Sequence, residues 1–178
     1  MASPMQRKRV SSRSVDGLTL LEILVVLFVS GLLSAITAPS CLAFLAKNQV
    51  SMAQQTVFSA HREAQSKALR EARSWVASFR NNTALRGQFA IHPAGITATS
   101  LTEAQWQSLP EGIAIDVDNT TPQKPPGSIY SVTFSMKGTS TNLGRIALTS
   151  KNTKARRCVF VSTLLGNLRT ESDENCLR

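Results

Sequence analysis

The feature that most constrains the fold is the apolar run of residues 18–38. A helix of this length rises about 30 Å, which matches the hydrocarbon thickness of a bilayer. Glu22 is the one ionisable side chain in the run. A carboxylate in lipid costs about 2.5–3.5 kcal/mol near the bilayer centre and less toward an interface. The run therefore predicts a membrane-spanning helix, and Glu22 needs an explanation of its own.

A short polar leader, residues 1–17, precedes the apolar run. Its basic residues outnumber the single acidic one and are Arg7, Lys8, Arg9 and Arg13. A secretory signal peptide has its small-residue cleavage site after the apolar stretch, whereas here the small residue Gly17 comes before it. The positive-inside rule keeps the leader in the cytoplasm and places the C-terminal portion on the far side of the membrane.

The charge balance says little about partners. The chain of 178 residues has 20 Lys and Arg against 11 Asp and Glu, and the leader accounts for part of that excess. The remaining positive charge favours encounters with anionic partners but identifies none. Aromatic residues make up only 6% of the chain, which argues against a base-stacking surface.

The sequence GLTLLE at residues 17–22 resembles the processing motif of the type IV pilin and pseudopilin family. The resemblance implies that a prepilin peptidase cuts after Gly17 and methylates the new amino terminus at Leu18, where the family usually has Phe or Met. It also implies other partners: pilin or pseudopilin subunits, an inner-membrane assembly platform and membrane lipid. The implied location is the bacterial inner membrane, with a periplasmic C-terminal domain, and afterwards a pilus or pseudopilus.

The same resemblance gives Glu22 a role in docking. In the family's filaments this glutamate is thought to meet the amino terminus of a neighbouring subunit. A carboxylate inside a membrane favours a cationic partner, and a methylated α-amine remains a cation. The alternative is a glutamate that reaches the interface in an ordinary single-span anchor.

Pro39 predicts a bend in the helix, because proline lacks an amide hydrogen and clashes with the carbonyl four residues back. A simple kink at the point where the helix leaves the membrane is the equal alternative. Beyond Pro39, apolar residues recur at spacings of three and four. They are Val57, Ala60, Ala64, Ala68, Ala72, Trp75 and Phe79. We therefore expect one helix over residues 18–80, packed through this stripe on a head domain of residues 81–178.

From Gly87 the period changes to two, which is typical of strands. The predicted strands are 88–92, 112–117, 129–135, 145–149, 158–162 and 167–170, and residues 119–127 are predicted to form a loop. The C-terminal segments GRIALTS, CVFVS and GNLRT resemble the GspH/FimT branch of the family. The expected fold is α+β, with a long N-terminal membrane-spanning helix packed on two small antiparallel sheets.

Three cysteines are present. Cys158 and Cys176 can form a disulfide if the C-terminal domain lies outside the cytoplasm, whereas three buried thiols are the alternative. Cys41 follows the apolar run.

The sequence contains no catalytic constellation, metal site or cofactor motif. His61 is expected on the polar side of the helix and His92 at a strand end, both solvated. The acidic pattern Asp116-x-Asp118-Asn119 lacks the ligand series of a calcium loop and predicts a strand end and turn.

One basic cluster is a candidate site for DNA. Its members are Lys151, Lys154, Arg156, Arg157 and Arg169. DNA-uptake members of the FimT group hold DNA with a G-R-x-R turn, which Gly166 and Arg169 match in part, because Asn167 replaces the first arginine. A solvated basic turn is the alternative.

The sequence thus predicts a minor pilin-like structural subunit that assembles or primes a type IV filament and is not an enzyme. A pseudopilin of a type II secretion system and a DNA-binding minor pilin are the alternatives.

Overall fold

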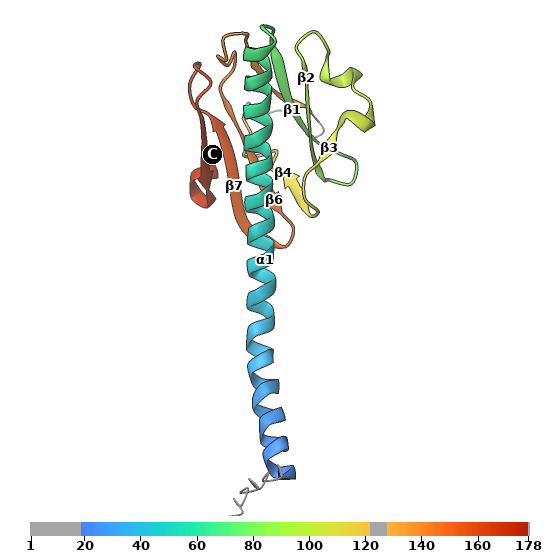
Figure 1. The fold of residues 1–178 in the computed structure, drawn as a ribbon, viewed down its shortest axis with the longest axis vertical. Helices are drawn as coiled ribbons and strands as arrows, with labels where there is room; N and C mark the ends of the chain where they lie inside the picture. The colour runs from blue at the N-terminus through green and yellow to red at the C-terminus, as the bar shows by residue number, and fades with distance from the viewer. Residues whose placement is uncertain (1–18, 122–127, 178) are drawn as a thin grey trace, which may run out of the picture. The chain divides into compact units, whose positions relative to one another are not determined.

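The computed structural model describes residues 19–121 and 128–177, and for residues 35–40 it describes the helix but not the side chains. The chain divides into two units, residues 1–40 and residues 41–178. Helix α1, Leu20–Arg70, contributes to both. The second unit contains all the strands (Figure 1).

The strands form two antiparallel sheets of four strands each. The first sheet has the order β3-β2-β1-β5, and its strands are β1 Trp75–Asn81, β2 Gly87–Pro93, β3 Gln107–Ser108 and β5 Tyr130–Phe134. The second has the order β4-β6-β7-β8, and its strands are β4 Ile113–Ile115, β6 Gly144–Ser150, β7 Thr153–Val161 and β8 Leu168–Ser172. The described residues also form three short 3-10 helices: η1 Ala98–Ser100, η2 Glu103–Gln105 and η3 Asp173–Cys176. The expected α+β fold with two antiparallel sheets is confirmed.

Within the second unit, α1 packs against both sheets through a stripe of small residues. The stripe is almost inaccessible to solvent and consists of Val50, Ala53, Val57, Ala60, Ala64 and Ala68. Alanine lets the helix backbone approach the sheets closely. Larger side chains from both sheets fill the space beside it: Phe79, Phe134, Leu148 and Val159 are fully buried. The core therefore lies between one helix and two sheets.

The predicted helix end at Arg80 is wrong, because α1 ends at Arg70. Ala72 has φ of 49°, a left-handed conformation that stops a helix. Residues 75–81 form β1 instead, the strand that pairs with both β2 and β5. Trp75 and Phe79 are four residues apart, a spacing that suits a helix face and one face of a strand equally. The compact second unit begins at Cys41, so it includes the C-terminal part of α1 together with the strands.

The six predicted strands correspond to β2 and β4 to β8, with small shifts at their ends. The largest shift is in β7, which begins at Thr153 rather than Cys158. Lys154, Arg156 and Arg157 precede Cys158 and are basic. The apolar pattern that predicted the strand therefore begins only at Cys158. The predicted loop 119–127 extends beyond the described residues.

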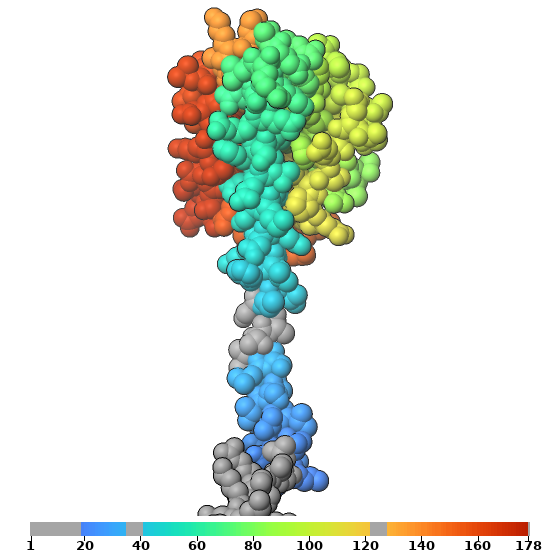
Figure 2. All heavy atoms as spheres, in the orientation of Figure 1, coloured from blue at the N-terminus to red at the C-terminus, as the bar shows by residue number. Residues whose placement is uncertain are grey.

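Two glutamine side chains of α1 form hydrogen bonds with backbone carbonyls in the loops and strands of the second unit. The side-chain amide of Gln54 donates to the carbonyls of Cys158 and Glu171, at 2.8 Å each. The amide of Gln65 donates to the carbonyls of Gly138 at 2.8 Å and Gly166 at 3.3 Å. Figure 2 shows the β5–β6 turn, in orange, beside the C-terminal end of α1, in green.

The disulfide between Cys158 and Cys176 is confirmed, and the alternative of three buried thiols is wrong. It joins β7 to η3 and packs with Ala147 and Phe160. Cys41 is a free, exposed thiol. The bridge fixes the C-terminal segment on the second sheet.

Replacing both bridged cysteines by alanine should destabilise the protein by about 3 kcal/mol, because the loop that the bond closes in the unfolded chain becomes free. The lost stability is measured as a lower urea midpoint. Cys41→Ala is the matched control and should leave the midpoint unchanged. An equal effect of both changes would contradict this role of the bridge.

Candidate functional site

The first turns of α1 present apolar side chains to solvent on all sides. Leu20 is 83% exposed and Leu27 67% exposed, and the side chains between them are also exposed. The hydroxyls of Ser30 and Ser34 donate to carbonyls one turn earlier in the helix, so they add little polarity to its surface. Within the described residues, no helical stretch is both long and apolar enough to span a membrane.

Glu22 lies in the first turn of this apolar surface. Thr19 immediately precedes the helix, and its hydroxyl accepts a hydrogen bond from the backbone amide of Glu22 at 3.2 Å. The position suits an acidic residue, because the amino end of a helix carries partial positive charge. Within the described residues, no cation pairs with the Glu22 carboxylate.

The other predicted residues of the N-terminal region are not described in the same detail. Gly17 and Leu18 lie outside the described residues, so cleavage and methylation stay predictions. Pro39 lies inside α1, but the surroundings of its side chain are not described. The bend at Pro39 also stays a prediction.

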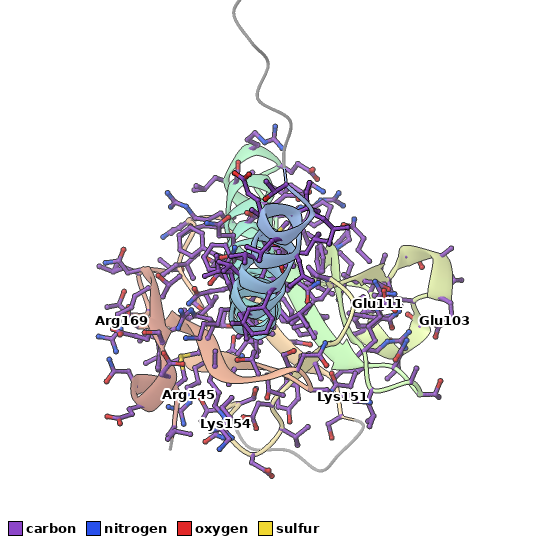
Figure 3. All side chains as sticks on the ribbon, turned by 90° about the horizontal axis from the view of Figure 1, so that it is seen from below. Glu103, Glu111, Arg145, Lys151, Lys154 and Arg169 are labelled. Atoms are coloured by element: carbon purple, nitrogen blue, oxygen red, sulfur yellow. A yellow bond between two sulfur atoms is a disulfide. The ribbon has the colours of Figure 1, made fainter. Side chains whose placement is uncertain are left out.

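The predicted basic cluster is spread over the second sheet rather than gathered in one turn. Lys151 lies in the β6–β7 turn, and the others lie on β7 or β8. Lys154 and Arg156 lie in the irregular part of β7, where its pairing with β6 shifts register between Thr153 and Arg157. Figure 3 shows Lys151, Lys154 and Arg169 at separate places around the second unit.

The arginines of the cluster have acidic partners. Arg156 Nε lies 3.2 Å from an Asp116 oxygen, and Arg157 Nη1 lies 3.2 Å from an Asp173 oxygen. The backbone amide of Arg156 also donates to Asp173, and this bond, with the side chain of Arg157, lowers the pKa of Asp173. Arg169 lies 3.7 Å from Glu171. These carboxylates compensate much of the charge that a phosphate backbone would meet.

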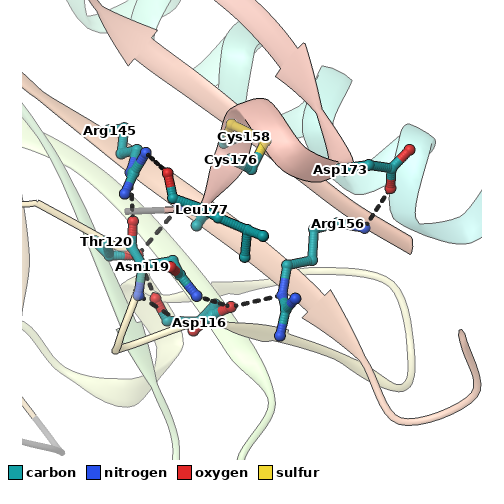
Figure 4. A network of polar contacts seen from close by, with 10 residues as sticks. Asp116, Asn119, Thr120, Arg145, Arg156, Cys158, Asp173, Cys176 and Leu177 are labelled. Carbon is teal, nitrogen blue, oxygen red and sulfur yellow. Dashed lines mark hydrogen bonds and ion pairs between the residues drawn. A yellow bond between two sulfur atoms is a disulfide. The ribbon is translucent and has the colours of Figure 1, made fainter. Parts of the chain in front are cut away.

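The acidic pattern at Asp116 forms a turn, as predicted (Figure 4). The Asp116 carboxylate accepts hydrogen bonds from the backbone and side chain of Asn119, at 3.3 and 3.0 Å. The Thr120 hydroxyl donates to the Asp116 carbonyl at 2.6 Å. In the part of the chain that the structure describes, no group of three or more acidic, histidine or cysteine side chains could hold a metal ion.

Arg145, which the sequence did not single out, closes this network. Its Nε donates to the carbonyl of Asn119 at 2.6 Å, and its Nη1 donates to the carbonyl of Leu177 at 2.8 Å (Figure 4). The side chain is nearly buried against Phe160. The cation thus holds the 116–121 turn and the C-terminal segment on β6. The signal in the sequence was an arginine directly before the apolar residues Ile146, Ala147 and Leu148 of the strand.

Gly166 has a structural reason to be glycine. Its φ is 79°, and a Cβ there would lie 2.5 Å from the Gly138 carbonyl oxygen and 2.6 Å from the Gln65 amide nitrogen. The residue was predicted as part of a DNA-binding turn. The geometry shows that the β7–β8 turn needs it in order to meet α1 and the β5–β6 turn.

Gly166→Ala should therefore destabilise the protein by at least about 2 kcal/mol, through left-handed strain and the displaced carbonyl. Gly95→Ala is the matched control, since nothing lies within 4 Å of a Cβ built there. Thermal unfolding of the two variants measures the difference. Similar melting temperatures would contradict this role of Gly166.

The prediction that both histidines are solvated is wrong. His61 is fully buried, stacked on Phe79 with ring centroids 4.8 Å apart. His92 is nearly buried, and its Nε2 lies 2.9 Å from the Ser78 hydroxyl. Ser78 in turn contacts the Ser131 hydroxyl. Ser78 is also fully buried, so this chain of contacts joins β1, β2 and β5 inside the protein.

Burial lowers the pKa of His61 from 6.5 to about 4, although its bond to the Val57 carbonyl acts in the opposite direction. The unfolded chain therefore takes up a proton at a higher pH than the folded chain does. The stability contributed by neutral His61 is complete above pH 6.5 and is lost as the pH falls toward 4. The total loss should be about 3 kcal/mol.

Urea unfolding between pH 7 and 4 measures this loss. His61→Phe keeps an aromatic ring on Phe79 but cannot take up the proton, so its stability should fall less over the same interval. An equal fall in both proteins would contradict the assignment to His61.

Sequence comparison finds no matching family model and no matching curated protein. Structural comparison finds two crystal structures of the type IV minor pilin FimU from Pseudomonas aeruginosa. The first has 15% sequence identity and a TM-score of 0.52, covering 75% of this chain and 98% of that one. The second has 13% identity and a TM-score of 0.48, covering 70% and 97%. The first match shows that this chain has a type IV pilin-like fold.

Proposed function

We propose that this chain is a minor pilin-like structural subunit that joins a type IV filament through the N-terminal part of α1. The supporting observation is an exposed apolar helix with one carboxylate, Glu22, for which the described residues provide no cation. The FimU structure, which shares the fold, is that of a type IV minor pilin. No catalytic role is part of the proposal.

The physical role of the apolar surface is to pack against the same segment of other subunits. Before assembly the segment is held in the inner membrane, and on assembly it exchanges lipid for neighbouring helices. Because lipid and helix surfaces are equally apolar, that exchange gains little from the hydrophobic effect. A specific polar contact then selects the correct neighbour.

Glu22 supplies this contact in the proposal. Cleavage after Gly17 leaves a methylated α-amine on Leu18, a cation four positions before Glu22. The amine of one subunit pairs with Glu22 of the next and fixes the register between them. The prepilin peptidase, the assembly platform and the neighbouring subunits are the partners that this mechanism requires.

DNA binding is not advanced as a second function. The arginines at 156, 157 and 169 have carboxylate partners, and Gly166 is explained by the packing of two turns against α1.

Mass spectrometry of the amino terminus tests the processing step. Protein from cells that contain a prepilin peptidase should begin at a methylated Leu18. The same chain with Gly17→Arg should keep its leader and enter no filament. An intact leader in the unchanged protein would refute the proposal.

Glu22→Ala and Glu22→Gln should abolish incorporation into filaments. In an apolar environment, loss of one partner leaves the other charge uncompensated, which costs about 3–5 kcal/mol. Immunoblots of sheared filaments measure incorporation. Glu111→Ala, at an exposed carboxylate of the second unit (Figure 3), is the matched control and should be incorporated normally. Normal incorporation of the Glu22 variants would contradict the docking role.

A further inference from the structure

A small cavity lies where the two sheets meet. It is lined mainly by residues of β5, the edge strand of the first sheet, and by residues just before and within β6 of the second sheet. His61 of α1 also lines it. Its volume is about 10 Å³, close to the smallest space that holds one water molecule.

His61, one of the residues that line this cavity, carries a hydrogen-bond acceptor without a partner among the described protein atoms. Its Nδ1 lies 2.8 Å from the Val57 carbonyl oxygen, so Nδ1 carries the hydrogen. In the neutral ring Nε2 then has a lone pair. The side chain is fully buried, and Nε2 has no hydrogen-bond partner among the described protein atoms. A buried acceptor of this kind requires a donor.

Two polar side chains that line the cavity already form hydrogen bonds with other groups. The Asn142 amide donates to the Ser131 carbonyl at 2.7 Å and accepts from the Thr133 amide. The Arg145 guanidinium donates to the carbonyls of Asn119 and Leu177. Arg145 is the charged group that lines the cavity, and Tyr130 is the other titratable one. No carboxylate lines it within the described residues.

We propose that the cavity binds one water molecule, which donates a hydrogen bond to Nε2 of His61 and bridges α1 to β5 and β6. The site takes a small neutral donor with more than one hydrogen-bonding group, and water is the ligand of that class that fits. Tyr130, Ser131 and Thr121, which also line the cavity, carry further oxygen atoms.

The bridge gives the helix a fixed register against the sheets. Much of the buried stripe of α1 is alanine, including Ala60, Ala64 and Ala68, and a stripe of identical small residues can slide by one turn with little change in packing. A histidine that hydrogen-bonds to a water molecule in a fixed cavity can do so in only one register of the helix. His61 and its water thus act with Gln54 and Gln65, whose amides also reach fixed carbonyl groups.

The test uses the full-length chain, labelled with ¹⁵N and ¹³C, in detergent micelles near pH 7. Water-to-protein Overhauser spectra should show a long-lived water at the carbon-bound ring protons of His61 and at the methyl groups of Ile146. The ¹⁵N shift of Nε2 should be that of an acceptor that receives a hydrogen bond. An Nε2 shift typical of a free lone pair, with no water signal at either residue, overturns the proposal.

Two variants show whether the water occupies this cavity. Val132→Ile adds one methylene to the cavity wall and should remove the water signal. It should also lower the urea midpoint, because Nε2 is left unpaired. In the His61→Phe background the same change should no longer lower the midpoint, since no acceptor is left to pair. A water signal that survives Val132→Ile, or a higher midpoint for Val132→Ile alone, would overturn the proposal.

Discussion

The close approach of α1 to both sheets is the contact on which the second unit depends. Alanines at 53, 60, 64 and 68 bring the helix backbone near the sheets, and large side chains from β1, β5, β6 and β7 fill the space around it. Neither sheet could bury its apolar face without the helix. The helix therefore forms one side of a single core to which both sheets contribute.

Around this apolar contact, polar groups fix a single arrangement of the helix, the turns and the C-terminal segment. Gln54 and Gln65 bond to carbonyls of strands and turns, and Gly166 lets the β7–β8 turn approach Gln65. At the other side of the second sheet, Arg145 and the disulfide hold the C-terminal segment. Apolar packing supplies most of the stabilisation, while directional contacts exclude neighbouring registers.

The two ends of α1 place ionisable groups in contrasting surroundings. Glu22 lies on an exposed apolar surface, and in our proposal its partner comes from another subunit. His61 is enclosed by its own chain, and burial keeps it neutral at physiological pH. One helix thus combines an exposed apolar surface with a fixed attachment to its own sheets.

The sequence by itself determined the apolar N-terminal segment, the position of Glu22 and six of the strands, because short-range periodicity and turn residues encode these features. The two-sheet arrangement was what the family resemblance implied. The sequence allowed a disulfide between Cys158 and Cys176 but left three buried thiols as an alternative, and the structure shows the bridge. Only the tertiary structure decided that Trp75 and Phe79 belong to a strand, since their spacing suits both periods. It also decided that His61 is buried and that Arg156 and Arg157 meet Asp116 and Asp173. These outcomes depend on residues that are distant in the sequence, and no local pattern shows which of them will meet.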